Sequence, residues 1–232
     1  MQPDVKRAFV FGGTGTVGGA VLQELARRGV PAVFTFHRSE DRARMLALEL
    51  GHTAVQVDLA DPVATTAMLD AQEPADVVIH CAGVSAGLVL PEIEVAAFQQ
   101  TMAVNVQSAF LACQWVARRA RRCDVVLVGG LDRTQSLPLP AHFAASQGAL
   151  SALVMAVAHE LGRHDIRINL VALGPLDGGL SAGLAARRRK DFETFSALRR
   201  VGKPDEAAKV IAWLALENTY IQGKVISANG GI

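Results

Sequence analysis

The amino-acid sequence predicts an α/β fold: a doubly wound parallel sheet of the Rossmann type, in a single domain over residues 1–232. Short apolar runs alternate with longer helical patterns along the whole chain, which is typical of strands joined by crossover helices. The runs are continuously apolar, as in strands buried on both faces. The first run leads into a glycine-rich turn that opens a helix, the arrangement of dinucleotide sites. A chain of 232 residues, 50% of them hydrophobic, can bury one large core.

The predicted strands are short runs rich in branched and aromatic residues. They cover residues 8–11, 32–36, 54–57, 76–80, 125–128, 167–171 and 224–227. Two stretches, 129–141 and 174–202, show no regular pattern, and each follows a strand. They therefore lie at the carboxyl edge of the sheet, where ligands bind in this architecture.

The predicted helices have recognisable start and stop residues. Gly29 and Gly51 end the first two, since glycine readily takes the left-handed conformation of a helix end. Asp61 precedes a proline that suits the first turn of the third helix. The predicted helices cover residues 17–28, 40–50, 98–121 and 143–162, with two more beginning at Pro62 and near Pro204.

Composition excludes several classes of protein. The net charge of +1 provides no field to hold nucleic acid or an anionic membrane. Cys81, Cys113 and Cys123 lack metal-ligand spacing, so no metal site is predicted and a reducing cytoplasm is expected. Residues 1–7 are short and polar, unlike a signal peptide. The most apolar stretch, 144–158, contains polar residues and is interpreted as a buried helix rather than a membrane span.

The glycine-rich turn after the first strand is predicted to hold a dinucleotide pyrophosphate. Its glycines let the backbone turn tightly and approach the phosphates. The free N–H groups at the start of the helix would bind the negative charge of these phosphates. The alternative is a tight strand–helix turn without a ligand. The residues predicted to contact the cofactor here are Gly12, Thr14, Gly15, Thr16, Val17 and Gly18.

The end of the second strand favours NADP(H) over NAD(H). An acidic residue there would bind a ribose 2′-hydroxyl and repel a 2′-phosphate, but the chain has His37, Arg38 and Ser39. The alternative is a solvated loop arginine. After the third strand, Asp58 and Leu59 are predicted to contact adenine, although Asp58 could equally cap the following helix.

Ordered motifs along essentially the whole chain resemble the short-chain dehydrogenase/reductase family, in particular 3-oxoacyl carrier-protein reductases. They are the glycine-rich turn, Asp58-Leu59, Cys81-Ala82-Gly83 in place of Asn-Ala-Gly, Asn105-Val106, residues 165–171, Gly174-Pro175, residues 202–206, residues 221–225 and Asn229-Gly230-Gly231. The resemblance implies that Cys81, Ala82, Gly83, Gly174 and Pro175 also contact the cofactor. It further implies a substrate lid at about 176–202, and a homodimer or homotetramer formed through the two long helices.

The resemblance also implies a catalytic set of serine, tyrosine, lysine and asparagine, from which this sequence departs. Phe143 stands at the tyrosine position, Gln147 at the lysine position and Gly130 at the serine position, while Asn105 is retained. Phenylalanine has no proton to donate, and glutamine cannot depress a neighbouring pKa, although its amide could bind a ribose hydroxyl. The ordinary tyrosine-based reaction is therefore excluded, and no catalytic residue is assigned.

Other side chains are candidates to replace the missing proton donor, and none of them is assigned that role. His142 is expected to point away from the direction of Phe143 and to bond locally at the helix start, because neighbouring helical residues diverge by about 100°. Ser146 is interpreted as a packing residue. His80 ends a strand near the cofactor edge. The loop beside the expected carbonyl position contains Asp132, Arg133 and Ser136.

Two basic runs are interpreted as solvated helix faces. Residues 118–122 close a long helix, where cations favour the helix dipole. Residues 187–190 lie in the lid-like segment and could instead contact an acidic carrier protein or a phosphopantetheine phosphate.

Three functional hypotheses follow. The first is an atypical NADPH-dependent ketoreductase acting on a small-molecule or carrier-bound carbonyl, of polyketide or 3-oxoacyl type. The second is an inactive NADP-binding pseudoenzyme that stabilises or regulates a partner reductase. The third is non-redox chemistry, such as dehydration or cyclisation, in the same pocket.

Overall fold

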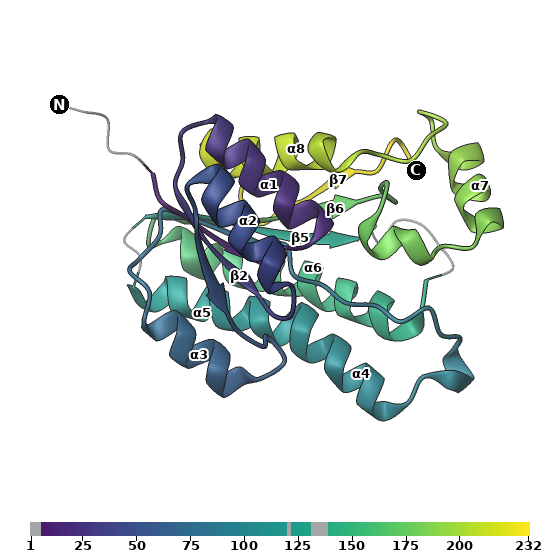
Figure 1. Cartoon of the computed structure of the whole chain (residues 1–232), viewed down its shortest axis with the longest axis horizontal. Coiled ribbons are helices and arrows are strands. Elements are labelled where there is room, and N and C mark those ends of the chain that lie inside the picture. The colour runs from purple at the N-terminus through teal and green to yellow at the C-terminus, as the bar shows by residue number, and fades with distance from the viewer. Residues whose placement is uncertain (1–5, 120–121, 131–138) are drawn as a thin grey trace.

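The computed structural model describes residues 6–119, 122–130 and 139–232. A seven-stranded sheet, parallel throughout, forms the centre of the molecule in the order β3-β2-β1-β4-β5-β6-β7 (Figure 1). The chain reverses its direction of winding between β1 and β4, which creates a ligand crevice at the carboxyl ends of these strands. The predicted doubly wound fold is confirmed. The strands are β1 (Ala8–Phe11), β2 (Ala32–Phe36), β3 (Thr53–Gln56), β4 (Val77–His80), β5 (Cys123–Gly130), β6 (Ile166–Leu173) and β7 (Val225–Ala228).

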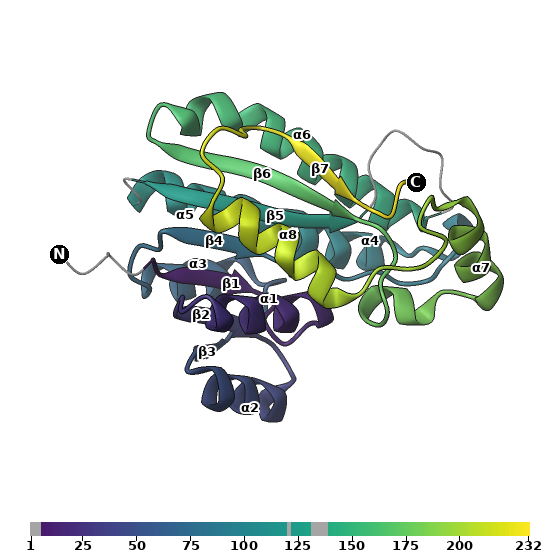
Figure 2. The same ribbon diagram turned by 90° about the horizontal axis from the view of Figure 1, so that it is seen from above.

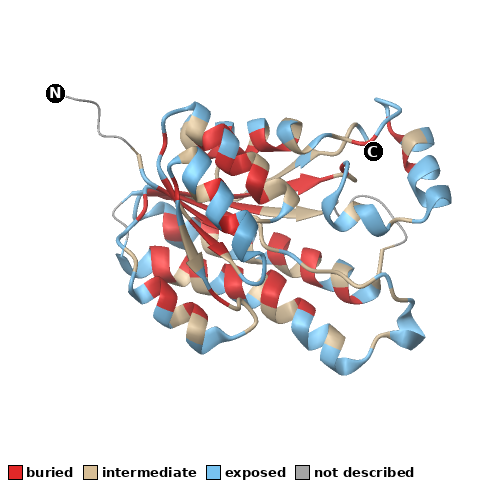
Figure 3. Cartoon of the chain, viewed as in Figure 1, coloured by how far each residue is buried: buried red, intermediate tan, exposed pale blue. Residues whose placement is uncertain are grey.

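Helices cover both faces of the sheet (Figures 1 and 2). One face carries α1 (Thr16–Arg27), α2 (Glu40–Leu50) and α8 (Pro204–Leu216), and the other carries α3 (Pro62–Asp70), α4 (Val95–Met102), α5 (Ser108–Arg119) and α6 (Ala141–Gly162). Two clusters of buried apolar side chains fill the two layers, with the strands between them (Figure 3). The central strands are thereby buried on both faces.

Local signals explain several helix ends. The carboxylate of Asp61 accepts hydrogen bonds from the backbone amides of Val63 and Ala64, and Pro62 occupies the first turn of α3. Gly51 ends α2 with φ 69°, a conformation in which a side chain would be strained. These ends agree with the predictions from sequence.

Helix α6 is long and apolar enough, by length and composition alone, to cross a membrane. In this fold it packs on β6 and β5, and one-third of its most apolar window is buried within the chain. It was predicted as a buried core helix, and its polar residues Ser146, Gln147 and Ser151 are all on the buried side.

The structure corrects two expectations about irregular and helical segments. The predicted helix 98–121 is interrupted by a π-helical segment, Ala103–Gln107, between α4 and α5. The stretch 174–202, expected to be irregular, contains a 3₁₀ turn at Gly179–Gly183 and helix α7 (Ala186–Phe195). Only Phe192 of α7 is buried, so the helix carries no apolar periodicity that sequence reasoning could detect. A short 3₁₀ turn at Leu90–Glu92 was also not predicted.

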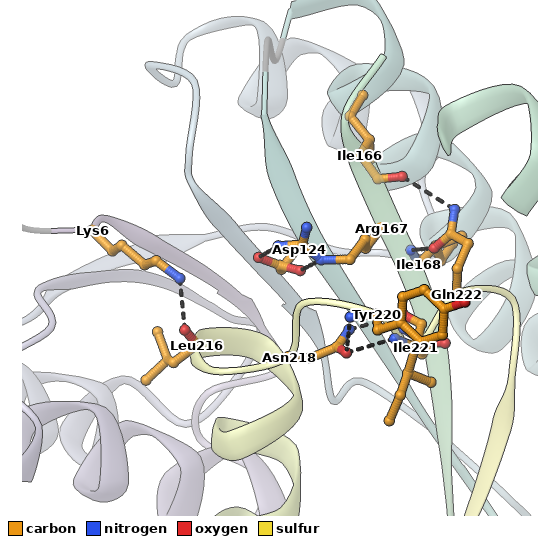
Figure 4. Close-up of polar contacts among 11 residues, drawn as sticks. Lys6, Asp124, Ile166, Arg167, Ile168, Leu216, Asn218, Tyr220, Ile221 and Gln222 are labelled. Atoms are coloured by element: carbon orange, nitrogen blue, oxygen red, sulfur yellow. Dashed lines mark hydrogen bonds and ion pairs between the residues drawn. The ribbon is translucent and has the colours of Figure 1, made fainter. Parts of the chain in front are cut away.

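The amino edge of the sheet is fastened by polar contacts (Figure 4). Arg167 donates from Nε and one terminal nitrogen to the two carboxylate oxygens of Asp124, at 2.7 and 2.8 Å. Gln222 accepts from the amide of Ile168 at 2.8 Å and donates to the carbonyls of Ala158 and Ile166. The contacts of Arg167, Ile168 and Gln222 therefore stabilise the sheet at the edge opposite the predicted cofactor site. These residues belong to two of the motifs, 165–171 and 221–225.

Candidate functional site

The glycine-rich turn lies where β1 ends and α1 begins. Gly12 has φ 73°, and a Cβ added there would stand 2.8 Å from the Cα of Ala82, which follows β4. A Cβ on Gly18 would collide with the carbonyl oxygen of Gly12. Both positions therefore require glycine, because the backbones approach too closely for a side chain.

Thr35 on β2 holds this turn in place. Its hydroxyl accepts from the amide of Gly12 at 2.9 Å, and its carbonyl accepts from the amide of Gly13 at 2.9 Å. Helix α1 begins at Thr16, its N-cap residue Gly15 provides no side-chain cap, and its first turn has no acidic residue. The amides of that turn are therefore available to an anion.

The end of β2 is followed by a histidine, an arginine and a serine, and the carboxylate of Asp58 lies near the histidine. His37 Nε2 lies 3.8 Å from a carboxylate oxygen of Asp58, and Arg38 and Ser39 are exposed. The other oxygen of Asp58 accepts from the amide of Ala60, whereas the cap of α3 is Asp61. The alternative interpretation of Asp58 as a helix cap is therefore wrong.

Arg42, in the first turn of α2, was not predicted as a site residue. One of its guanidinium nitrogens lies 3.3 Å from the position that a Cβ on Gly19 would take, so the side chain reaches across to α1. Arg38 precedes α2, which begins at Glu40, so no helical spacing links the two arginines and the sequence carried no clear signal for Arg42.

Phe143, Gly130 and Gln147 meet at the carboxyl end of β5, and Asn105 joins them from the π-helical segment. The ring atoms Cε1 and Cζ of Phe143 lie 3.3 Å from where a Cβ on Gly130 would be. Gln147 Oε1 accepts from the amide of Gly130 at 2.8 Å. The structure thus brings together the four positions that the resemblance grouped.

A network of hydrogen bonds uses the polar atoms of this cluster. Gln147 Nε2 donates to Ser146 Oγ at 3.1 Å, and Asn105 Nδ2 donates to the same oxygen at 2.9 Å. The Ser146 hydroxyl donates to the carbonyl of Phe143. Asn105 also pairs with both backbone groups of Val84. Gln147 is buried, and its amide nitrogen already donates one hydrogen to Ser146, so a ribose hydroxyl would have to be bound by the second one. Its contact with the cofactor stays a prediction.

The lid-like segment lies against the nucleotide turn. Gly178 and Gly179 have φ 94° and 60°, and a Cβ on Gly179 would lie 3.1 Å from Cβ of Thr16. The side chain of Leu180 reaches within 3.9 Å of a Cβ position on Gly83. The segment therefore spans the crevice from the start of α1 to the end of β4.

The remaining predicted cofactor residues line the same edge. A Cβ on Gly174 would stand 2.9 Å from Cα of Asn229, so Gly174 and Pro175 start the lid-like segment in tight contact with the end of β7. The amide of Cys81 donates to the carbonyl of Phe11 at 3.0 Å. Burial raises the pKa of the Cys81 thiol to about 12, so it is not a thiolate nucleophile at neutral pH.

His142 does not bond locally, contrary to expectation. Its side chain is 1% exposed, and Nε2 accepts from the backbone amide of Ala86 at 3.3 Å, 56 residues away. The first turn of α6 carries the ring toward the loop after β4. The expectation that His142 and Phe143 diverge is confirmed, since Phe143 turns to Gly130 instead.

His80 is fully buried and forms part of the core. Its Nε2 lies 2.7 Å from the hydroxyl of Ser108, which itself donates to the carbonyl of Val104, so His80 is the donor. Burial lowers the pKa of His80 to about 4. The ring is neutral near pH 7 and has no access to a substrate proton. Asp132, Arg133 and Ser136 lie outside the described residues.

Within the described ranges, no group of three or more His, Cys, Asp or Glu residues could hold a metal ion. In the basic run 187–190, Arg189 forms ion pairs with Asp177 and Glu193, and its neighbours Arg187 and Lys190 are exposed. The run therefore lies on a largely solvated face of α7, as interpreted from sequence.

Comparisons with known proteins agree on one family. Residues 14–232 match the profile of a family described as enoyl-(acyl carrier protein) reductase. The chain is 29% identical to the 3-oxoacyl-[acyl-carrier-protein] reductase MabA of Mycobacterium bovis, over 99% of this chain and 94% of that protein.

Two solved structures are similar over nearly the full chain. A short-chain dehydrogenase from Burkholderia cenocepacia in complex with NADP has a TM-score of 0.92 and 27% identity, covering 100% of this chain and 99% of its own. The structure of BdcA in complex with NADPH has a TM-score of 0.91 and 26% identity, and the match covers 98% of this chain and 94% of BdcA.

Proposed function

Because this chain belongs to the short-chain dehydrogenase/reductase family, we propose that it is an NADP(H)-dependent ketoreductase with an atypical site. Its substrate is a small-molecule or carrier-bound ketone of polyketide or 3-oxoacyl type. The observation that carries the proposal is the nucleotide turn, where Gly12 approaches Ala82 too closely for any side chain beside an uncapped helix start. Family relatives with NADP or NADPH bound share this fold at TM-scores above 0.9.

The residues around the turn fit NADP(H). The amides at the start of α1 would hold the pyrophosphate, and Arg38 and Arg42 would meet the 2′-phosphate from two sides of the β2–α2 turn. Asp58 lies beside His37 and would contact adenine or its ribose. When bound, the cofactor supplies the hydride for a carbonyl carbon.

The proton for the carbonyl oxygen has no evident side-chain source at the cluster of Gly130, Phe143 and Gln147. A positioned acid commonly contributes roughly 10²- to 10⁴-fold to such a reaction. In its absence, water or a hydroxyl on the substrate itself supplies the proton, and positioning of the ketone provides the rest. Turnover is therefore expected to be slow and selective for β-oxygenated ketones.

One observation favours a second function, that of an NADP(H)-binding pseudoenzyme which stabilises a partner reductase. The cluster at the carboxyl end of β5 is internally satisfied: Gln147 uses both ends of its amide, and Phe143 covers Gly130. In this arrangement Phe143 offers a carbonyl oxygen no hydrogen bond, and Gln147 has only its second amide hydrogen left to offer. The third hypothesis, non-redox chemistry, gains no support from the cluster.

The first experiment is calorimetry of NADPH and NADH with the purified protein, followed by NADPH oxidation with β-hydroxyketones and 3-oxoacyl thioesters. Micromolar NADPH binding, weak NADH binding and ketone-dependent oxidation are expected. Binding without oxidation, together with co-purification of an active homologue, would establish the pseudoenzyme instead. No binding of either nucleotide would overturn both functions.

Assembly and location complete the proposal. Phe110 on α5 and Met155 on α6 are about half exposed, at 46% and 52%, and would be covered in a homodimer or homotetramer formed through these helices. Light scattering tests this assembly. All three cysteines are free, which suits a reducing cytoplasm.

A further inference from the structure

Helix α1 contains a glycine that its own backbone does not require. Gly19 lies in the first turn, where its amide donates to the carbonyl of Gly15 at 2.8 Å, and it is not among the glycines with positive φ. Outside its own helix, a Cβ at Gly19 would meet no backbone atom closer than the carbonyl oxygen of Gly13, at an ordinary contact distance of 3.6 Å. Glycine destabilises a helix relative to alanine, so the helix alone would favour alanine here.

The space beside Gly19 is taken by the guanidinium group of Arg42. Helices α1 and α2 lie side by side on one face of the sheet (Figure 1). From α2, Nη2 of Arg42 comes within 3.3 Å of the position that a Cβ on Gly19 would occupy. A methyl group there would push the guanidinium by a few tenths of an ångström, and a larger side chain would displace it. Because the carbonyl of Gly13 borders the same space, the guanidinium lies beside the nucleotide turn.

No internal partner accounts for this position of Arg42. Over the residues that the structure describes, its side chain forms no hydrogen bond and no ion pair. Arg44, on the same helix, is paired with Glu40 at 2.7 Å. Arg42 is exposed, so its charge is available to an anion that binds at the start of α1, where the backbone amides are also available.

We propose that Gly19 determines the preference for NADP(H) over NAD(H), because it leaves the space from which Arg42 binds the 2′-phosphate. Gly19 has no side chain to contact the phosphate, so it acts through Arg42 as a positioning residue. NADPH and NADH differ only in this phosphate, so the position of one cation changes the affinity for NADPH alone. The inference rests on the proposed function, since it requires the dinucleotide to bind at this turn.

Calorimetry of NADPH and NADH with the variant Gly19→Leu tests the inference. The Kd for NADPH is expected to rise about tenfold, the loss of roughly one charge-assisted contact. The Kd for NADH is expected to stay unchanged. The control is Gln23→Leu, at an exposed position of the same helix, which should leave both Kd values unchanged.

A double variant shows whether Gly19 acts through Arg42. When Arg42→Ala is already present, the addition of Gly19→Leu should change the Kd for NADPH by less than about twofold, because the cation that leucine would displace is gone. If leucine only disturbed the fold, it would weaken NADPH by the same factor with or without Arg42, and it would weaken NADH as well.

The smaller variant Gly19→Ala separates nucleotide binding from folding. Without nucleotide, its melting temperature is expected to rise by about 2 °C, since alanine stabilises a helix relative to glycine. Its Kd for NADPH is nevertheless expected to rise about threefold, because the guanidinium must shift away from the phosphate. This variant decides the matter if Gly19→Leu does not fold.

The inference is overturned if the folded Gly19 variants bind NADPH as tightly as the unaltered protein. It is also overturned if leucine weakens NADPH equally in the presence and absence of Arg42. In both cases the unaltered protein still binds NADPH, and the proposed function stands. If the unaltered protein binds neither nucleotide, the proposed function fails and the inference fails with it.

Discussion

The ring of Phe143 packs edge-on against the backbone of Gly130, with Cε1 and Cζ both 3.3 Å from where a Cβ at residue 130 would be. The ring of Phe143, on α6, fills the space next to β5 that a side chain at residue 130 would take. A larger residue at 130 therefore requires the ring to move by a few tenths of an ångström. Substitutions at residues 130 and 143 are therefore expected to affect each other.

Restoring the family set is expected to require several changes together. The triple variant Gly130→Ser, Phe143→Tyr and Gln147→Lys should raise ketone-dependent NADPH oxidation by roughly 10²-fold or more, the contribution of a positioned acid. Gly130→Ser alone should give no gain, because Phe143 remains without a proton to donate. Initial rates by absorbance measure both. A triple variant that binds NADPH but oxidises none would argue that the pocket itself cannot hold a ketone.

Gly12→Ala is expected to abolish NADPH binding. The added methyl group meets the backbone of Ala82 at 2.8 Å, and φ 73° is unfavourable for alanine. Gly29→Ala is the matched control, because Gly29 has φ 71° but nothing within 4 Å of its Cβ position. Gly29→Ala should lose roughly 1–2 kcal/mol of unfolding free energy from its backbone conformation alone. Gly12→Ala should lose more, because of the added contact with Ala82, and only Gly12→Ala should lose the nucleotide. Equal Kd values for NADPH in the two variants, measured by calorimetry, would contradict the assignment of this turn as the nucleotide site.

Arg38→Ala and Arg42→Ala are each expected to raise the Kd for NADPH about tenfold and to leave NADH unchanged. Each removes one charge-assisted contact to the 2′-phosphate, worth roughly 1.5–3 kcal/mol. Arg44→Ala is the control on the same helix, since Arg44 already pairs with Glu40 at 2.7 Å. If the binding of NADPH and the binding of NADH weaken to the same extent, the two arginines support the fold and do not contact the 2′-phosphate.

Arg167→Met is expected to lower the free energy of unfolding by about 3 kcal/mol, because it leaves the buried Asp124 carboxylate unpaired. Burial already raises the pKa of Asp124, and Arg167 opposes that rise. The comparison is Arg119→Met, which breaks an exposed pair with Asp70 and should cost less than about 1 kcal/mol. Urea unfolding near pH 7 distinguishes the two.

His80 should make stability depend on pH. Its pKa falls from 6.5 to about 4 on folding, so the unfolded chain binds the proton more tightly. The stabilising effect of the neutral ring is full above pH 6.5 and is lost as the pH falls toward 4. The expected loss is about 3 kcal/mol over that range. In His80→Asn the unfolding free energy should no longer fall with pH over this range. If chemical unfolding showed the same pH dependence as in the unaltered protein, His80 would not be its cause.

Much of the fold could be predicted because its signals are local. Asp61 and Pro62 start a helix by their own chemistry, and Gly51 ends one. The π-helical segment Ala103–Gln107 could not be predicted, because its side chains are compatible with an ordinary α-helix. What distinguishes it is tertiary: Asn105 within it pairs with the backbone of Val84.

The candidate site was only partly predictable for the same reason. The positions of Phe143, Gln147 and Gly130 followed from the family resemblance, and the structure brings them together. The bond between His142 and Ala86 crosses 56 residues, and Thr35 acts on the turn through a neighbouring strand. No local pattern encodes such contacts, so they emerge only when the sheet is assembled.

The contact of Gly178 and Gly179 with Thr16 has a kinetic consequence. Residues 178–180 rest on the start of α1 and reach Gly83. With NADP(H) bound in the crevice as proposed, we expect the dinucleotide to bind or leave only after these residues lift. Its residence time is then governed by the rate of that lifting, a property separate from its affinity. Gly178 and Gly179 both have positive φ, a conformation that is strained for other residues, so we expect a substitution at either position to change the rate at which oxidised nucleotide exchanges for reduced.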